Sequence, residues 1–438
     1  MPVSRGRKSK KGGKKKNSRR SGGPLAGPSG GVRYGPGDPL APLRSLMGPP
    51  SRPAWFDQAI KNVLEQADDL VTSPGPRELE QATAELLGGE LYQVVHDEDS
   101  TGLWFDWWFA ELAEAAATRA GEDRTGNSGR RGPWWLLHGL TAVGSPALRT
   151  KAQAALGRAR NARRADASSE AEGPDWLGRL NKVGATGEVW SLRDAYGTRL
   201  AVVAGVDHTG GGDTSAFLFD IDACGMIELV GAGGFDDVEQ AATAWRSAVG
   251  DTAAGASPTP VDKPDDLHCL VQWDSGEAGL KGDEPRGLLD NWFLARRRVH
   301  DIAVALRGRG MRLPEVRSLF IDLDTAPAAE AFTRWYEERH GTAPNQDVVQ
   351  ALAEEWLEGC LPSTEHAVSP HRVRHRLTLI NDWQPDHPVT VGARSLLPEW
   401  ARWHGEQSGL PEELVERSVA AADAPGGAVT CGGVEHHL

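Results

Sequence analysis

The first twenty residues of this chain carry its densest chemistry, a run of cations without a single acid. Ten side chains in this basic arm are positively charged: Arg5, Arg7, Lys8, Lys10, Lys11, Lys14, Lys15, Lys16, Arg19 and Arg20. Cations at this density bind phosphate groups and release counterions, which gives affinity for nucleic acid without reading its sequence. A solubilising tail is the alternative. We therefore predict that the arm contacts nucleic acid or ribosomes.

The charge is divided unevenly between the arm and the rest of the chain. The 438 residues include 48 Lys and Arg against 61 Asp and Glu, a formal charge of −13. Without the ten arm cations, 38 basic residues face 61 acidic ones, and the remainder carries −23. Six of the 11 lysines lie in the first 16 residues, whereas arginine is the usual cation elsewhere. Because the arm uses lysine where the rest of the chain uses arginine, we expect its charge to have a function. The acidic remainder of the chain is a second candidate partner for the arm.

A second set of residues has the types needed for hydrolysis. Asp207, His208, Asp220 and Asp222 stand at the ends of short apolar runs. Carboxylates and imidazoles that meet in one pocket act as acid and base, or hold a metal for phosphoryl or phosphodiester hydrolysis. Their spacing defines no third metal ligand, so no metal or other cofactor is assigned and the catalytic residues stay unknown. A hydrolase is therefore the alternative to a non-enzymatic function.

Two further patterns were weighed for metal chemistry. His371 and His375 are four residues apart, but Arg372, Arg374 and Arg376 alternate with them. Ligation would need another carboxylate or histidine nearby, and three guanidinium groups oppose a cation. We therefore predict no metal site there.

The segment Leu319–Thr325 resembles the first motif of haloacid-dehalogenase-type phosphotransferases, with aspartates at its fourth and sixth positions. The resemblance implies Asp322 as the nucleophile and Asp324 as the acid or base beside a magnesium ion, with Asp382 and Asp386 in the metal-binding segment. About 60 residues separate the two segments, too few for the several βα units of such a fold. We expect these aspartates to serve turns instead.

Composition bounds the class of protein. No stretch of 18 apolar residues is present, so no membrane span is expected. The four cysteines are widely spaced, and the basic start is followed by Gly and Pro instead of an apolar signal segment. Both features favour reduced thiols in a cytoplasmic protein.

The hydrophobic pattern predicts an α+β fold: two mainly helical regions flank a small antiparallel four-stranded sheet with one packing helix, behind a disordered basic arm. The predicted strands are short apolar runs with breaks that suit hairpins and leave no room for crossover helices. Asp236 is predicted to cap the packing helix. The expected parts are 1–52 (disordered basic arm and linker), 53–165 (helical), 179–250 (sheet plus helix), 267–422 (mainly helical, after a short strand at Leu267–Gln272) and 423–438 (flexible tail).

The C-terminal region offers one further likeness. Leu396–Trp400 and Gly409–Val415 are similar to the closing segment of many uncharacterised actinobacterial proteins. That resemblance implies no activity. The leading prediction is a non-enzymatic cytoplasmic adaptor or regulator, whose arm contacts nucleic acid or ribosomes and whose acidic body contacts a protein partner.

Overall fold

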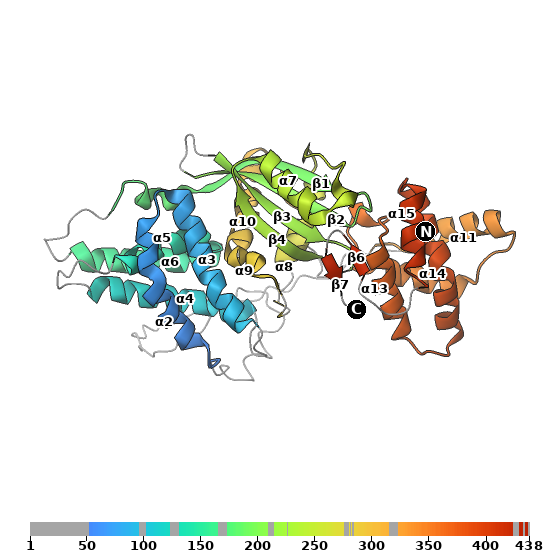
Figure 1. Ribbon diagram of the computed structural model, residues 1–438, viewed down its shortest axis with the longest axis horizontal. Coiled ribbons are helices and arrows are strands. Elements are labelled where there is room, and N and C mark those ends of the chain that lie inside the picture. Colours follow the sequence, from blue (N-terminus) through green and yellow to red (C-terminus); the bar gives the residue numbers. More distant parts are fainter. Residues whose placement is uncertain are drawn as a thin grey trace, which may run out of the picture. The chain divides into compact units, whose positions relative to one another are not determined.

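The computed structural model is an α+β protein built from helices and one main antiparallel sheet (Figure 1). It describes residues 52–95, 102–122, 131–164, 173–208, 214–225, 227–275, 280, 282, 284–314, 323–423, 429–431 and 434–436. The ten arm cations lie outside this described part. Among the described residues, no helix has the length and apolar character that crossing a bilayer requires.

The sheet has the strand order β4-β3-β2-β1-β5, with every neighbouring pair antiparallel. Its strands are β1 (Gly184–Arg193), β2 (Arg199–Asp207), β3 (Thr214–Asp222), β4 (Glu228–Phe235) and β5 (Thr259–Pro260). The first four confirm the predicted meander. The fifth was not predicted, because β5 has only two residues and lies in a segment rich in Ala, Pro and Thr.

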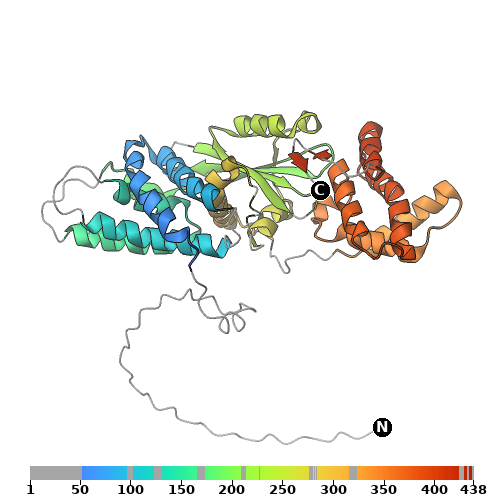
Figure 2. The same cartoon turned by 60° about the horizontal axis from the view of Figure 1, so that its bottom comes forward.

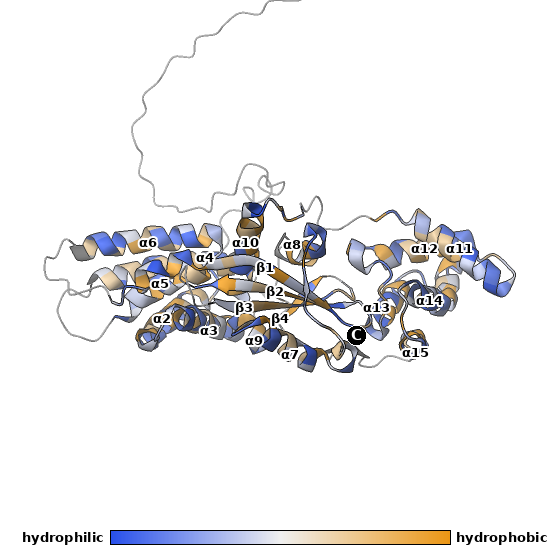
Figure 3. Ribbon diagram, turned by 90° about the horizontal axis from the view of Figure 1, so that it is seen from above, coloured by the Kyte–Doolittle hydropathy of each residue, from blue (hydrophilic) through white to orange (hydrophobic). Residues whose placement is uncertain are grey.

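Both faces of the sheet are covered, and the alternation along the central strands divides their side chains between two cores. Val202, Ala204 and Phe219 face one apolar cluster, whereas Ala201 and Val203 face another. The second cluster is completed by α7 (Val238–Val249), which packs on β2 and β3 (Figure 2). Because buried neighbours lie on both sides, β2 is apolar along most of its length (Figure 3).

The helices before the sheet share the first of these cores. They are α2 (Phe56–Gln66), η1 (Ala67–Thr72), α3 (Pro76–Val94), α4 (Gly102–Glu122), α5 (Gly132–Val143), α6 (Pro146–Arg164) and η2 (Leu177–Lys182). Pro133 is the second residue of α5 and leaves no amide unsatisfied there. Every residue of α5 is buried, which its apolar sequence predicts.

Helices after the sheet complete the fold. α9 (Arg286–Asp290) and α10 (Trp292–Gly308) pack on the sheet and on α3. A separate apolar cluster unites α11 (Ala326–His340), α12 (Gln346–Leu357), α13 (Pro370–Asn381), α14 (Pro388–Gln407) and α15 (Glu412–Ala420), and η5 (Pro362–Thr364) connects α12 to α13. Phe332, Trp400 and Trp403 form the aromatic centre of this cluster.

Several local predictions are wrong. The predicted strand Leu267–Gln272 is helical, spanning the end of η4 (Pro264–Leu267) and the start of α8 (His268–Ser275), after η3 (Asp251–Ala253). The N-cap of α7 is Asp237 and not Asp236. In the segment 423–438, the three-residue strands β6 (Val429–Cys431) and β7 (Val434–His436) pair with each other, while the flexibility of that segment stays a prediction.

Candidate functional site

The residues proposed for hydrolysis lie at opposite ends of the sheet. Asp207 pairs with Thr214 at one end of β2, and Arg199 pairs with Asp222 at the other. Eight residue steps separate these ends, roughly 26 Å along an extended strand. The structure therefore brings Asp220 and Asp222 together, and places Asp207 and His208 far from both.

The His208 end holds a buried polar cluster. The His208 Nε2 atom is 2.8 Å from Ser215 Oγ, and its Nδ1 atom is 3.8 Å from Glu80 Oε2. The Glu80 carboxylate also accepts a hydrogen bond from Arg298, which pairs with Asp301 at 2.9 Å. Burial raises the pKa of Glu80 despite the Arg298 charge. A serine, a histidine and a carboxylate in this order suit nucleophilic catalysis, but here the carboxylate is shared with Arg298 and all three groups are buried.

The same cluster explains the arginine-rich helix α10. Arg297 donates to Asp301 Oδ1 at 2.7 Å, while Arg296 donates to Asp106 of α4 at 2.7 Å. Arg297 and Arg298 are buried, so this part of the sequence is an internal ion network and not the exposed face expected for charged residues. Such a network ties α3, α4 and α10 together.

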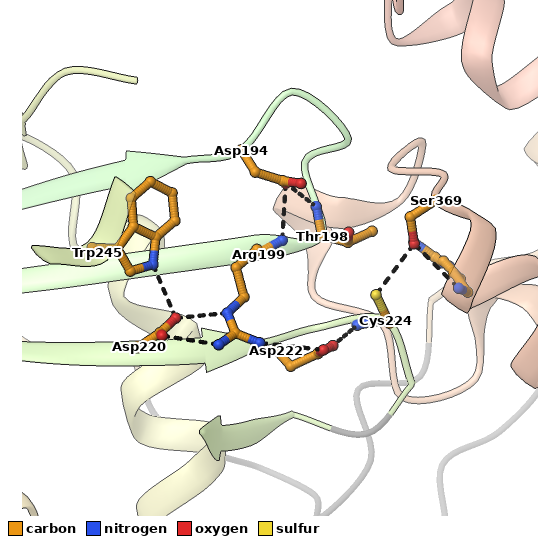
Figure 4. A network of polar contacts seen from close by, with 9 residues as sticks. Asp194, Thr198, Arg199, Asp220, Asp222, Cys224, Trp245 and Ser369 are labelled. Carbon is orange, nitrogen blue, oxygen red and sulfur yellow. Dashed lines mark hydrogen bonds and ion pairs between the residues drawn. The ribbon is translucent and has the colours of Figure 1, made fainter. Parts of the chain in front are cut away.

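The other end of the sheet holds the more chemically varied cluster (Figure 4). The Arg199 guanidinium donates to both oxygens of Asp220, at 2.7 and 2.9 Å, and lies 3.7 Å from Asp222 Oδ2. Trp245 of α7 donates to Asp220 Oδ1 at 2.9 Å. Burial lowers the pKa of Arg199, but the charges of Asp220 and Asp222 outweigh that effect and raise it. This arginine therefore stays charged inside the protein.

A third carboxyl group borders this cluster. Asp194, in the β1–β2 turn, accepts hydrogen bonds from the backbone amides of Thr198 and Arg199, both at 3.0 Å. Burial raises the pKa of Asp194 to about 6, although these hydrogen bonds oppose the shift. Three buried carboxyl groups therefore surround Arg199: Asp220 and Asp222 face its guanidinium, and Asp194 accepts from its backbone amide.

The β3–β4 turn connects this cluster to α13. The Cys224 amide donates to Asp222 Oδ1 at 2.7 Å, and the Cys224 sulfur lies 3.2 Å from Ser369 Oγ. His371 is the second residue of α13. One donor atom each of Asp222, Cys224 and His371 lies within 4.8 Å of the other two, and all three side chains are buried. Among the described residues, these three side chains form the group that could hold a metal ion.

Two of the three arginines that alternate with the histidines, Arg372 and Arg376, have other partners. Arg372 donates to the carbonyl oxygens of Thr364, Ala367 and Trp356 at 2.7 to 3.0 Å, and also to the Cys360 sulfur. Arg376 donates to the Glu358 carbonyl at 2.9 Å and pairs with Glu355 at 3.4 Å. The sequence analysis argued that these guanidinium groups would oppose a cation bound at His371. That argument is weaker for Arg372 and Arg376, because both bind other groups.

The dehalogenase-like segment has no comparable arrangement. Asp322 lies outside the described residues. Asp324 is exposed and accepts a hydrogen bond from the Ala326 amide at 3.1 Å, next to the start of α11. Asp382 and Asp386 are also exposed. Of these aspartates, Asp324 accepts the backbone hydrogen bond that is expected of a turn residue.

No protein-family model, no curated protein and no solved structure matches this chain. The candidate site therefore rests on the chain's own geometry. Sequence reasoning singled out Asp222 and weighed His371, but missed Cys224, because the three residues meet only through the tertiary fold. The one available signal was the pair of histidines four residues apart.

Proposed function

We propose that this chain is a non-enzymatic cytoplasmic adaptor that contacts nucleic acid through its basic arm. The observation that carries the proposal is the placement of ten cations and no acid in residues 1–20, on a chain whose remainder carries −23. Electrostatic binding of this kind needs charge density and no fixed geometry. The acidic remainder would repel nucleic acid and would contact a protein partner instead.

The described structure supports this assignment to the arm, because several arginines outside the arm already bind partners inside the protein. Arg199, Arg297 and Arg298 are buried in ion networks with carboxylates, and Arg372 is enclosed by backbone carbonyls. A buried guanidinium that already has partners cannot reach a phosphate without breaking them. The hydrolase alternative is less well supported, because its four residues do not meet in one pocket.

The test is binding of fluorescent RNA and duplex DNA to the full chain, measured by anisotropy at several salt concentrations. Ten phosphate contacts would give a slope of log affinity against log salt of about −9 for duplex DNA, and four contacts about −4. Replacing the six arm lysines by glutamine should therefore weaken binding and flatten the slope. Replacing the same six by arginine is the matched control and should preserve both.

The opposite results would exclude the proposal. Binding by the glutamine variant that equals the wild type would assign the contact to another surface. An absence of binding by the full chain at low salt would remove nucleic acid as the partner. Circular dichroism of both variants should match the wild type, because every side chain of the buried cores described above is unchanged in them.

A further inference from the structure

We propose that Asp222, Cys224 and His371 form a structural zinc site that joins the β3–β4 turn to α13. The three side chains come from two segments far apart in the sequence and supply one oxygen, one sulfur and one nitrogen donor. This set suits Zn²⁺, which is bound by thiolate, imidazole and carboxylate, and does not suit Mg²⁺ or Ca²⁺, which prefer oxygen ligands.

The distances are close to those of a loaded site. Bonds of 2.0 to 2.3 Å in a tetrahedron place ligand atoms about 3.3 to 3.7 Å apart. The three donor atoms already lie within 4.8 Å of one another. A contraction of about 1 Å, which small side-chain rotations provide, would complete the geometry.

The surroundings hold two of the three ligands, Cys224 and Asp222, in place. Ser369 Oγ accepts a hydrogen bond from the Arg372 amide at 3.1 Å, which leaves its hydroxyl proton for the Cys224 sulfur at 3.2 Å. Asp222 is oriented by the Cys224 amide through Oδ1 and lies 3.7 Å from Arg199 through Oδ2. Partners of this kind orient metal ligands and tune their basicity.

The fourth position has a nearby donor. His375 lies one helical turn after His371, and a Cβ atom at Gly225 would be only 3.1 Å from its ring. Glycine at this position therefore lets the β3–β4 turn approach α13 closely. We assign the fourth ligand to His375, whose ring centre lies 6.4 Å from that of His371, because a structural zinc is enclosed by four protein ligands.

Burial decides between a structural and a catalytic role. Asp222, Cys224 and His371 are 4%, 0% and 6% exposed, and Ser369 is fully buried. A catalytic zinc must keep a position that a substrate can reach, whereas a structural zinc is enclosed by its ligands. The enclosure of this site favours a zinc that stabilises the contact between sheet and helix.

The experiment uses the untagged full chain, stripped with a chelator and titrated with Zn²⁺ against a chromogenic competitor. We expect one zinc per chain, and a loss of affinity of more than about a hundredfold in Cys224→Ser and His371→Gln, since even partners outside the ligand set cost 10- to 100-fold. Co²⁺ substitution should give a thiolate charge-transfer band that Cys224→Ser abolishes. Cys269→Ser and Cys431→Ser are matched controls that should retain both.

A second readout covers variants that fold poorly. Zinc should raise the Tm of the stripped wild type, and chelator should reverse the rise; Asp222→Asn should lose this response while Cys269→Ser keeps it. The proposal is overturned if the wild type binds no zinc at micromolar free metal. It is also overturned if Cys224→Ser binds as tightly as the wild type, or if Cys431→Ser alone abolishes the cobalt band.

Discussion

His138 is a buried histidine in α5 that stays neutral over most of the pH range. Its ring lies edge-on to Trp134, with 5.0 Å between the ring centres. Burial, together with the nearby Arg160 charge, lowers the pKa of His138 to about 4. In the unfolded chain a histidine titrates near 6.5. Acid therefore protonates the unfolded chain first, and stability that is present above pH 6.5 is lost as the pH falls toward 4.

Replacing His138 by glutamine should remove this dependence. We expect the free energy of unfolding of the wild type to fall by up to about 3 kcal/mol more than that of His138→Gln between pH 6.5 and 4. Urea unfolding at a series of pH values measures the difference. His340→Gln, on α11, is the control and should follow the wild type. Identical pH profiles for wild type and His138→Gln would contradict the prediction.

For single residues, the sequence identifies which side chains could take part in chemistry but not which residues lie beside them. Asp220 and Asp222 were candidates from their position at a strand end, and the structure does place them in one polar cluster. Their partners Arg199 and Cys224 are apparent only once the strand register is known, since antiparallel pairing sets which residues lie side by side. His371 joins them from a helix in another part of the chain.

The packing helix α7 depends on a single side chain at its start. Asp237 has an extended backbone (φ −151°) and its Oδ1 accepts a hydrogen bond from the Gln240 amide at 2.8 Å. The neighbouring Asp236 pairs with Arg77 at 2.7 Å in an exposed position. Asp237 satisfies a helix amide, whereas Asp236 makes a surface ion pair, so the two acids contribute differently.

Two alanine variants separate these contributions. Asp237→Ala should lower the free energy of unfolding by about 1 kcal/mol, the usual cost of losing an N-cap. Asp236→Ala should cost clearly less than Asp237→Ala, and less still at high salt, because the Asp236–Arg77 ion pair is exposed to solvent. Chemical denaturation midpoints give both values. Equal losses of stability, or a larger loss for Asp236→Ala, would contradict this assignment and favour Asp236 as the N-cap, as the sequence pattern predicted.

Four short apolar runs were correctly predicted as strands, because the breaks between them suit hairpins, but one such run was not. β2 and β3, whose side chains alternate between two buried faces, are two of the four. The run Leu267–Gln272 was taken for a strand, yet Leu267, Leu270 and Trp273 are buried at helical spacing. A run of six residues with four apolar members fits both periods, so the neighbouring residues decide between strand and helix. Here Pro264 starts a helical turn just before it.

On the scale of the molecule, the N-terminal helices and the sheet share one apolar core. Phe293 of α10 packs against Trp108 and Phe109 of α4, with ring centres 6.3 and 5.2 Å apart. The same cluster continues to Phe217 and Phe219 of β3. Helices that bury their aromatic residues against later elements lose that burial when the chain is cut between them.

A fragment of residues 53–164 should therefore fail to form a rigid core. We expect helical far-ultraviolet circular dichroism but little near-ultraviolet signal from its tryptophans, together with binding of a hydrophobic dye. A fragment of residues 53–314, which retains Phe293 and the sheet, is the control and should show a cooperative transition. Sharp near-ultraviolet bands from the shorter fragment would show that the predicted region 53–165 folds on its own.

The sequence predicted the α+β class because helical and alternating patterns occupy separate stretches of the chain. It did not predict the shared core, since hydrophobic periodicity shows which face of an element is buried and not which element covers it. The ion network of Glu80, Arg298 and Asp301 is of the same kind. Glu80 lies on α3, whereas Arg298 and Asp301 lie on α10. The hydrophobic pattern of either helix gives no sign that these charged residues meet.

The two-residue strand β5 also affects how this protein behaves in a crowded solution. The edge of a sheet exposes unpaired amides and carbonyls, which recruit strands from other molecules and start aggregates. Thr259 and Pro260 occupy the edge beside Ser191 and Trp190 and are themselves exposed. Proline has no amide proton to offer a further strand. A short, proline-containing end strand thus protects the sheet against edge-to-edge association at the concentrations reached during synthesis.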